Sequence, residues 1–198
     1  MMQQEKRVSF VGILVTASLL VNLGLTMLNE TLQLPFFFDS IGTAVTAASA
    51  GLVPGIIVAV WTNLLHELYY GFVGASWPFF VCGVATVLIV RAFIKAKRFS
   101  SVGDVLLASL LVGLANAVLG GAVAAFLFGG MTNVGLDYLV AGLVTAGRSL
   151  VSAAFLARIP ANLVDKAIAV FAAFFLMGPI ERWRVRHFAV RSTDEPAV

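Results

Sequence analysis

Long apolar runs with almost no charge dominate this sequence and limit what it can fold into. A helix needs about 20 mostly apolar residues to cross a bilayer. Six such stretches follow one another: Val8 to Asn29, Phe36 to Leu52, Gly55 to Phe72, Trp77 to Ile94, Val105 to Phe128 and Asn162 to Ile180. Charged residues make up only 12% of the chain, against about 25% in ordinary soluble proteins. The sequence therefore predicts an all-α integral membrane protein with six transmembrane helices in the lipid bilayer.

The positions of Lys and Arg predict how the helices are oriented. Cations gather near the first residues, in the run 91–98 and again in 182–191. Because cytoplasmic flanks carry an excess of Lys and Arg, an even number of crossings should place all three groups and both termini in the cytoplasm. A seventh stretch, Leu136 to Ala157, contains Arg148, and its crossing would put the arginine-rich end outside. We expect this stretch to be a re-entrant or outer-surface helical segment.

The expected domain organisation is one membrane domain over residues 1–191 and a short, disordered cytoplasmic tail over 192–198. The net charge of +3 does not indicate a nucleic-acid partner, because the cations lie at helix flanks and no nucleic-acid-binding motif is present. A single cysteine, Cys82, excludes an internal disulfide and a thiolate metal cluster. We expect Cys82 to be a small buried apolar residue.

Polar side chains within the apolar runs mark a candidate binding site, because such groups are costly inside a membrane. Asn63, His66, Glu67 and Tyr70 have the spacing i, i+3, i+4 and i+7, which puts them on one helix face. The topology brings this face to the level of other polar and aromatic residues: Phe37, Asp39, Trp77, Asn116, Asn162 and Lys166. Apolar walls with a few placed polar groups are typical of a small-molecule pocket. We predict that these residues bind a substrate.

Several of these residues also have a purely structural interpretation. Trp77 can belong to an aromatic belt at the membrane interface. Glu67 can neutralise Lys166 or Arg148 and so hold helices together. Asn116 can make a hydrogen bond between helices. The sequence leaves both interpretations open.

Motifs for catalysis, metal binding or ATP hydrolysis do not occur in the sequence. The pair His66-Glu67 lacks the second histidine of HExxH, so it does not predict a zinc site. The Walker A motif GxxxxGK[ST] is absent, so the chain is not expected to hydrolyse ATP itself. The nucleophile motif GxSxG is absent as well. We expect no cofactor, no metal and no enzymatic activity.

Three segments carry a resemblance to a known family. They are Leu34 to Thr43, the turn from Gly51 to Gly55, and Ile159 to Lys166, in a chain of 198 residues. In this order they resemble the substrate-binding S component of energy-coupling factor (ECF) vitamin transporters. The resemblance implies a high-affinity binder of a vitamin or related micronutrient in the bacterial cytoplasmic (inner) membrane, with an outer pocket and the first extracellular loop as a lid. The alternative is a membrane sensor or accessory subunit that signals to a partner protein.

The first expected helix bears on possible partners. Many S components contact a membrane-embedded T subunit through a small AxxxA surface, and the T subunit works with two ATPases. Here Gly12, Thr16 and Ala17 offer small residues, but the fourth position after Ala17 is Val21. Small residues let helices approach closely. Two options follow: a diverged contact with a T subunit, or a solitary S-type protein.

Overall fold

The chain folds into a bundle of apolar helices in the computed structural model, which describes residues 2–72, 76–132 and 135–188. The elements are α1 (Met2–Thr31), α2 (Ile41–Ala50), α3 (Leu52–Tyr69), the 3₁₀ turn η1 (Trp77–Phe79), α4 (Phe80–Lys95), α5 (Val102–Leu127), α6 (Asp137–Thr145) and α7 (Leu150–Phe188). Within the described ranges, five spans are long and apolar enough to cross a membrane: α1, α3, η1 with α4, α5 and α7. The predicted all-α membrane fold is confirmed. The expected tail, 192–198, lies outside the described residues.

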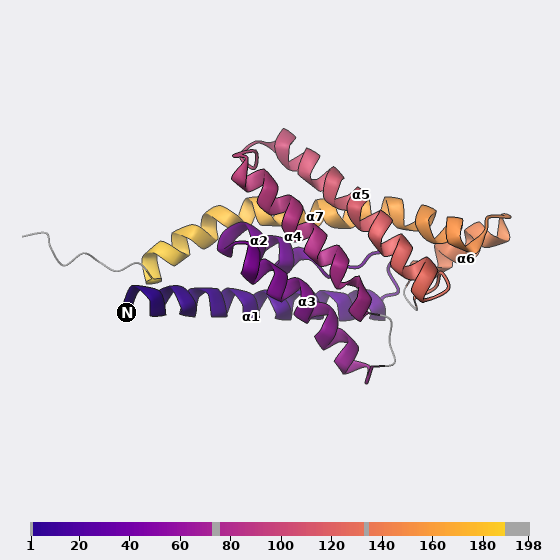
Figure 1. The fold of residues 1–198 in the computed structure, drawn as a ribbon, viewed down its shortest axis with the longest axis horizontal. Coiled ribbons are helices and arrows are strands. Elements are labelled where there is room, and N and C mark those ends of the chain that lie inside the picture. The colour runs from indigo at the N-terminus through magenta and orange to yellow at the C-terminus, as the bar shows by residue number, and fades with distance from the viewer. Residues whose placement is uncertain (1, 73–75, 133–134, 189–198) are drawn as a thin grey trace, which may run out of the picture.

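Both ends of the described chain lie at the same end of the bundle (Figure 1). The Phe10 ring in α1 lies 5.8 Å, between centroids, from the rings of Trp183 and Phe188 in α7. The α2–α3 junction and the α4–α5 connection lie toward this end too, whereas α6 lies at the opposite end. The described parts of the three cationic segments therefore share one end of the bundle.

The second expected helix, 36–52, is wrong in its extent, because α2 has only ten residues. The backbone before α2 binds side chains of other helices instead of forming helical hydrogen bonds. Asn29 donates to the Phe36 carbonyl (2.7 Å), and the Phe38 N–H donates to Asp165 Oδ1 (2.8 Å). Phe38 also has a φ of +54°, outside the right-handed helical region. α2 is a short helix packed among α1, α3, α4 and α7 rather than a full span.

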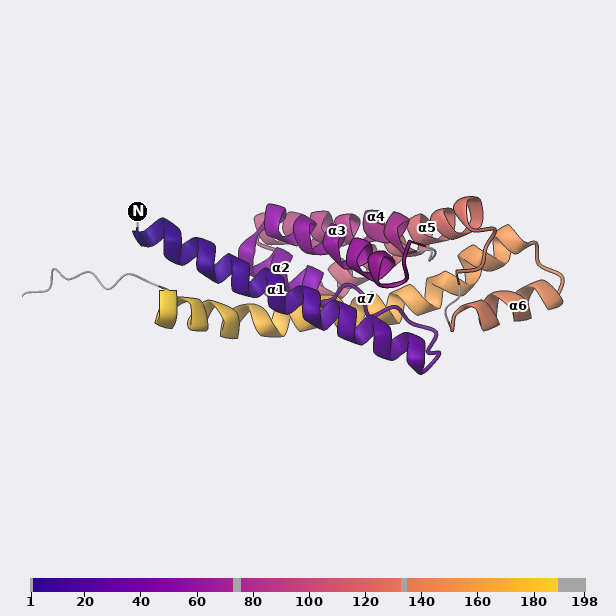
Figure 2. The same cartoon turned by 90° about the horizontal axis from the view of Figure 1, so that it is seen from below.

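The stretch 136–157 does not form one segment, which corrects the sequence interpretation. α6 ends at Thr145, and the chain turns through Gly147, whose φ of +87° suits glycine. Residues from Leu150 onward belong to α7, so the sixth expected helix begins earlier than Asn162. Figure 2 shows α6 folded back beside the first part of α7. Arg148 is exposed in the turn between them.

The remaining helices differ from expectation mainly at their ends. α3 begins at Leu52 rather than Gly55, directly after the bend at Gly51, whose φ is +110°. Pro54 lies in the first turn of α3, where its missing N–H removes no helical hydrogen bond. The turn predicted from the Gly51–Gly55 motif is therefore shorter than expected.

A buried polar cluster fixes α2 against α1 and α3. Asn22 Nδ2 donates to Thr43 Oγ1 and Thr62 Oγ1, each at 3.0 Å, and its Oδ1 accepts from the Gly42 N–H at 2.7 Å. A Cβ at Gly42 would lie 2.4 Å from the carbonyl oxygen of Ser18, so only glycine permits this approach of α1 and α2. Thr62 also borders the cavity described next.

Candidate functional site

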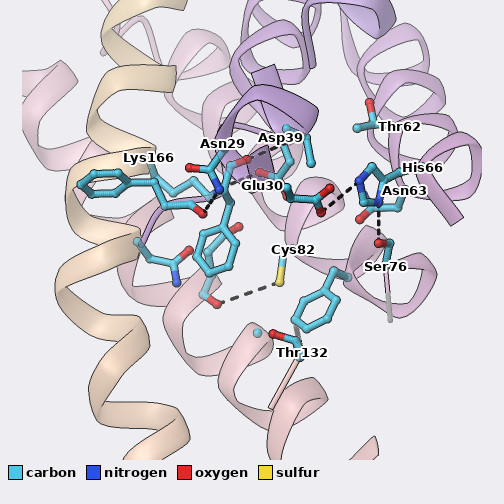
Figure 3. Close-up of a pocket in the computed structure, with 17 residues that line it drawn as sticks. Asn29, Glu30, Asp39, Thr62, Asn63, His66, Ser76, Cys82, Thr132 and Lys166 are labelled. Carbon is cyan, nitrogen blue, oxygen red and sulfur yellow. Dashed lines mark hydrogen bonds and ion pairs between the residues drawn. The ribbon is translucent and has the colours of Figure 1, made fainter. Parts of the chain in front are cut away.

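A cavity lies between the helices (Figure 3), and it is lined by the last turns of α1, in the half of the bundle away from the chain ends (Figure 1). It holds about 760 Å³ of empty space, part of it open to solvent. Its walls come from α1, the segment 32–40, α3, η1, α4, α5, the α5–α6 connection and α7. Side chains from several helices therefore surround one space inside the bundle.

Seven of the ten predicted binding residues line this cavity: Phe37, Asp39, Asn63, His66, Asn116, Asn162 and Lys166. They come from four separate parts of the chain, and the asparagines lie on three different helices. The other three, Glu67, Tyr70 and Trp77, are not among the lining side chains.

Glu67 is buried and supports the wall of the cavity from behind. Its Oε2 accepts the backbone N–H groups of Ser76 (2.7 Å) and Trp77 (3.1 Å). Hydrogen bonds from backbone N–H groups to a carboxylate are stronger than neutral ones. Glu67 thus fixes the start of η1, and the structure does not pair it with Lys166 or Arg148 as the sequence had suggested. Trp77 is half exposed and stacks on Phe80, with 6.4 Å between ring centroids.

Glu30, His66 and Tyr70 connect α1 to the end of α3. His66 Nε2 lies 3.1 Å from Glu30 Oε1, and its Nδ1 lies 2.6 Å from Ser76 Oγ. The Tyr70 hydroxyl donates to Glu30 Oε2 at 2.8 Å. This hydrogen bond, together with burial and the charge of Glu30, raises the pKa of Tyr70 to about 12. Tyr70 therefore stays protonated at neutral pH and keeps donating.

Lys166 joins the segment before α2 to α7. Its ammonium lies 2.7 Å from Asp39 Oδ1, 2.6 Å from Asp165 Oδ2 and 2.8 Å from Ser40 Oγ. It also lies 5.6 Å from the centroid of the Phe37 ring, within cation–π range. Burial alone would raise the pKa of Asp39, but the charge of Lys166 outweighs it and keeps that pKa below its ordinary value. Asp39 and Lys166 form a buried ion pair at the cavity wall.

The sequence did not predict several of the residues that line the cavity. Asn29 and Glu30 are adjacent polar residues at the end of the first apolar run, and both line the cavity. Their position at the end of that run could have indicated a binding site there. Cys82 is buried as expected, but it borders the cavity rather than the apolar core alone. Ser76 and Thr132 lie in connections between helices, where no helical periodicity indicates which way a residue faces.

The residues proposed for a partner contact lie on the outside of α1. Gly12, Thr16 and Ala17 are exposed, whereas Leu14 and Ser18 face the bundle. A Cβ at Gly12 would have no other atom within 4 Å. This face of α1 is therefore open to lipid or to another helix.

Within the described residues, no cluster of three or more His, Cys, Asp or Glu side chains is placed to hold a metal ion. The comparisons add no relative. No family model, curated protein or solved structure matches the chain.

Proposed function

We propose that this chain is a membrane-embedded, high-affinity binding and transport subunit for a vitamin or related micronutrient. The cavity carries the proposal, because it combines aromatic walls with amide groups from four helices. Such a composition suits a small, partly polar organic solute. The resemblance of the segments before α2 and within α7 to ECF S components supports the same function.

The charge distribution supports uptake from the outer side. The cationic segments share the end of the bundle that holds both chain ends, and Lys and Arg favour the cytoplasmic side. In a bacterial cytoplasmic membrane, this orientation puts both termini in the cytoplasm. The cavity then lies in the outer half, where it can receive solute from outside.

The segment 32–39 is suited to cover a bound solute. Its backbone is held by Asn29 of α1 and Asp165 of α7, and its last residue, Asp39, pairs with Lys166. Release of these contacts would open the cavity between this segment, α3 and α7. Delivery to the cytoplasm then requires reorientation of the bundle, and binding shifts this equilibrium only through different affinities for the two states.

Equilibrium binding tests the proposed function directly. We would purify the chain in lipid nanodiscs and measure binding of radiolabelled vitamins by equilibrium dialysis, with chemical analysis of the recovered ligand. We expect one vitamin to bind with nanomolar affinity and to be recovered unchanged. If no vitamin binds, or if the bound compound is converted to a product, the proposed function is wrong.

The exposed face of α1 is where we expect a T subunit to bind if ATPases energise transport. If Gly12, Thr16 and Ala17 contact a T subunit that works with two ATPases, Ala17→Trp should abolish uptake into cells and leave equilibrium binding unchanged. Leu106→Trp, on the exposed face of α5, is the matched control and should leave uptake intact. Undiminished uptake by wild-type protein in cells without any T subunit would instead show a solitary transporter.

A further inference from the structure

Three of the four asparagines that line the cavity bind their own helices, and Asn116 Nδ2 also donates to Thr86 Oγ1 of α4. Nδ2 of Asn63, Asn116 and Asn162 donates to the backbone carbonyl four residues earlier, at 3.0, 3.0 and 2.9 Å. Because a carbonyl oxygen can only accept, these bonds determine which end of each amide is nitrogen and which is oxygen. Each side chain therefore has its acceptor, Oδ1, left for another partner.

The acceptors lack donors among the described residues. Asn116 Oδ1 is buried without a hydrogen-bond partner, and so is Oδ1 of Asn29, whose Nδ2 donates to the Phe36 carbonyl. Oδ1 of Asn63 and Oδ1 of Asn162 also accept no hydrogen bond from a described residue, but these two atoms do not belong to the buried, unpartnered set. Buried acceptors without partners are uncommon because the loss of water is not compensated. A ligand that presents N–H groups would satisfy them.

The buried lysine is not available to bind an anion. Lys166 donates hydrogen bonds to Asp39 Oδ1 and Ser40 Oγ, and its charge is also compensated by Asp165 Oδ2, 2.6 Å away. Arg158, a second buried cation, is not among the side chains that line the cavity, and it donates to the Ala154 carbonyl and Thr132 Oγ1.

Carboxylates outnumber cations around the cavity. Two carboxylates, Glu30 and Asp39, line it together with one lysine, Lys166. A carboxylate or phosphate would lose its hydration there and meet like charge. The cavity therefore disfavours an anionic ligand.

We propose that the ligand is a flat, nitrogen-containing ring compound, neutral or cationic, that donates N–H groups to the asparagine oxygens. Phe36, Phe37 and Phe79 offer aromatic surface for the ring, and Phe79 itself stacks on Phe128 with 6.1 Å between centroids. This inference rests on the proposed function and narrows it to one class of micronutrient. Carboxylated and phosphorylated compounds are excluded from the class.

Matched pairs of compounds test the ligand class in the nanodisc-embedded chain. The pairs are nicotinamide with nicotinate, pyridoxamine with 4-pyridoxate, and thiamine with thiamine monophosphate. Each pair keeps the ring and changes an N–H-bearing or uncharged group into an anion. We expect at least one amine or amide member to bind, and its anionic partner to bind at least tenfold more weakly.

Two variants connect this preference to the asparagines. Asn63→Leu and Asn162→Leu remove an acceptor but leave intact the helix whose carbonyl the amide had bound, so both should fold. Each should weaken binding of the preferred compound by about 5- to 150-fold, as expected for one lost hydrogen bond in a dry site. Thr145→Val is the control, because Thr145 makes the same bond to its own helix, at the Ala141 carbonyl, far from the cavity. It should leave binding unchanged.

The outcomes separate this inference from the proposed function. Tighter binding of an anionic member, or unchanged affinity in both asparagine variants with normal melting temperatures, overturns the ligand class. If an anionic vitamin nevertheless binds with nanomolar affinity and is taken up unchanged, the proposed function stands. Failure of every compound in the vitamin panel and the matched pairs to bind overturns both.

Discussion

Glu67→Gln distinguishes a supporting carboxylate from a ligand-binding one. Glu67 Oε2 accepts two backbone N–H groups at the start of η1, and the side chain is only 1% exposed. Hydrogen bonds to a charged group contribute about 1.5–3 kcal/mol, and neutral ones about 0.5–1.5 kcal/mol. Glutamine keeps the shape and one acceptor oxygen, so each of the two bonds should weaken by about 1 kcal/mol. We expect the free energy of unfolding to fall by about 2 kcal/mol in total.

The assay combines thermal unfolding with equilibrium binding on the same nanodisc preparation. For a chain of this size, about 2 kcal/mol corresponds to a melting temperature lower by roughly 4–8 °C. Ligand affinity should change less than fivefold, because Glu67 does not line the cavity. The control Glu181→Gln removes an exposed partner of Arg184 and should cost less than about 1 kcal/mol. An unchanged melting temperature together with a large loss of affinity would refute this reasoning and make Glu67 a ligand-binding residue.

Two further predictions concern helix packing and orientation. Gly42→Ala should lower the free energy of unfolding by about 1–3 kcal/mol in a thermal melt, because its Cβ would meet the Ser18 carbonyl, whereas Gly12→Ala should be neutral or stabilising. Equal effects of the two changes would contradict the close approach of α1 and α2. In intact cells, a membrane-impermeant maleimide should label Leu32→Cys but not Ser100→Cys, and the reverse pattern would invert the orientation. The native Cys82 is buried and should contribute little background.

The sequence predicts those parts of the fold that depend on local pattern. Apolar runs locate α1, α3, α4 and α5, because a lipid-facing helix needs a continuous apolar stretch. The start of α2 could not be predicted, since it depends on the Phe38 N–H binding Asp165, 127 residues later in the chain. The break before α7 was not predicted either. Gly147 is present in the sequence, but a single glycine does not show whether a helix ends there.

Only part of the candidate site could likewise be predicted from the sequence. The face formed by Asn63, His66 and Glu67 follows from helical spacing, and all three are buried. Spacing does not show which of them meet the cavity, and Glu67 instead binds the backbone of η1. The partner of His66 lies on α1, and Glu30 could not be assigned to it without knowing how α1 and α3 pack.

The bonds from each cavity asparagine to its own helix have an entropic consequence. A side chain that becomes ordered on binding costs about 0.5–1.5 kcal/mol, and for Asn63, Asn116 and Asn162 that ordering is already present in the ligand-free protein. Together the three save roughly 1.5–4.5 kcal/mol, which corresponds to about one to three powers of ten in affinity. Asparagine side chains that are fixed in this way do not adjust to different ligands. They favour one arrangement of donor groups and reject close analogues in which a single donor is displaced.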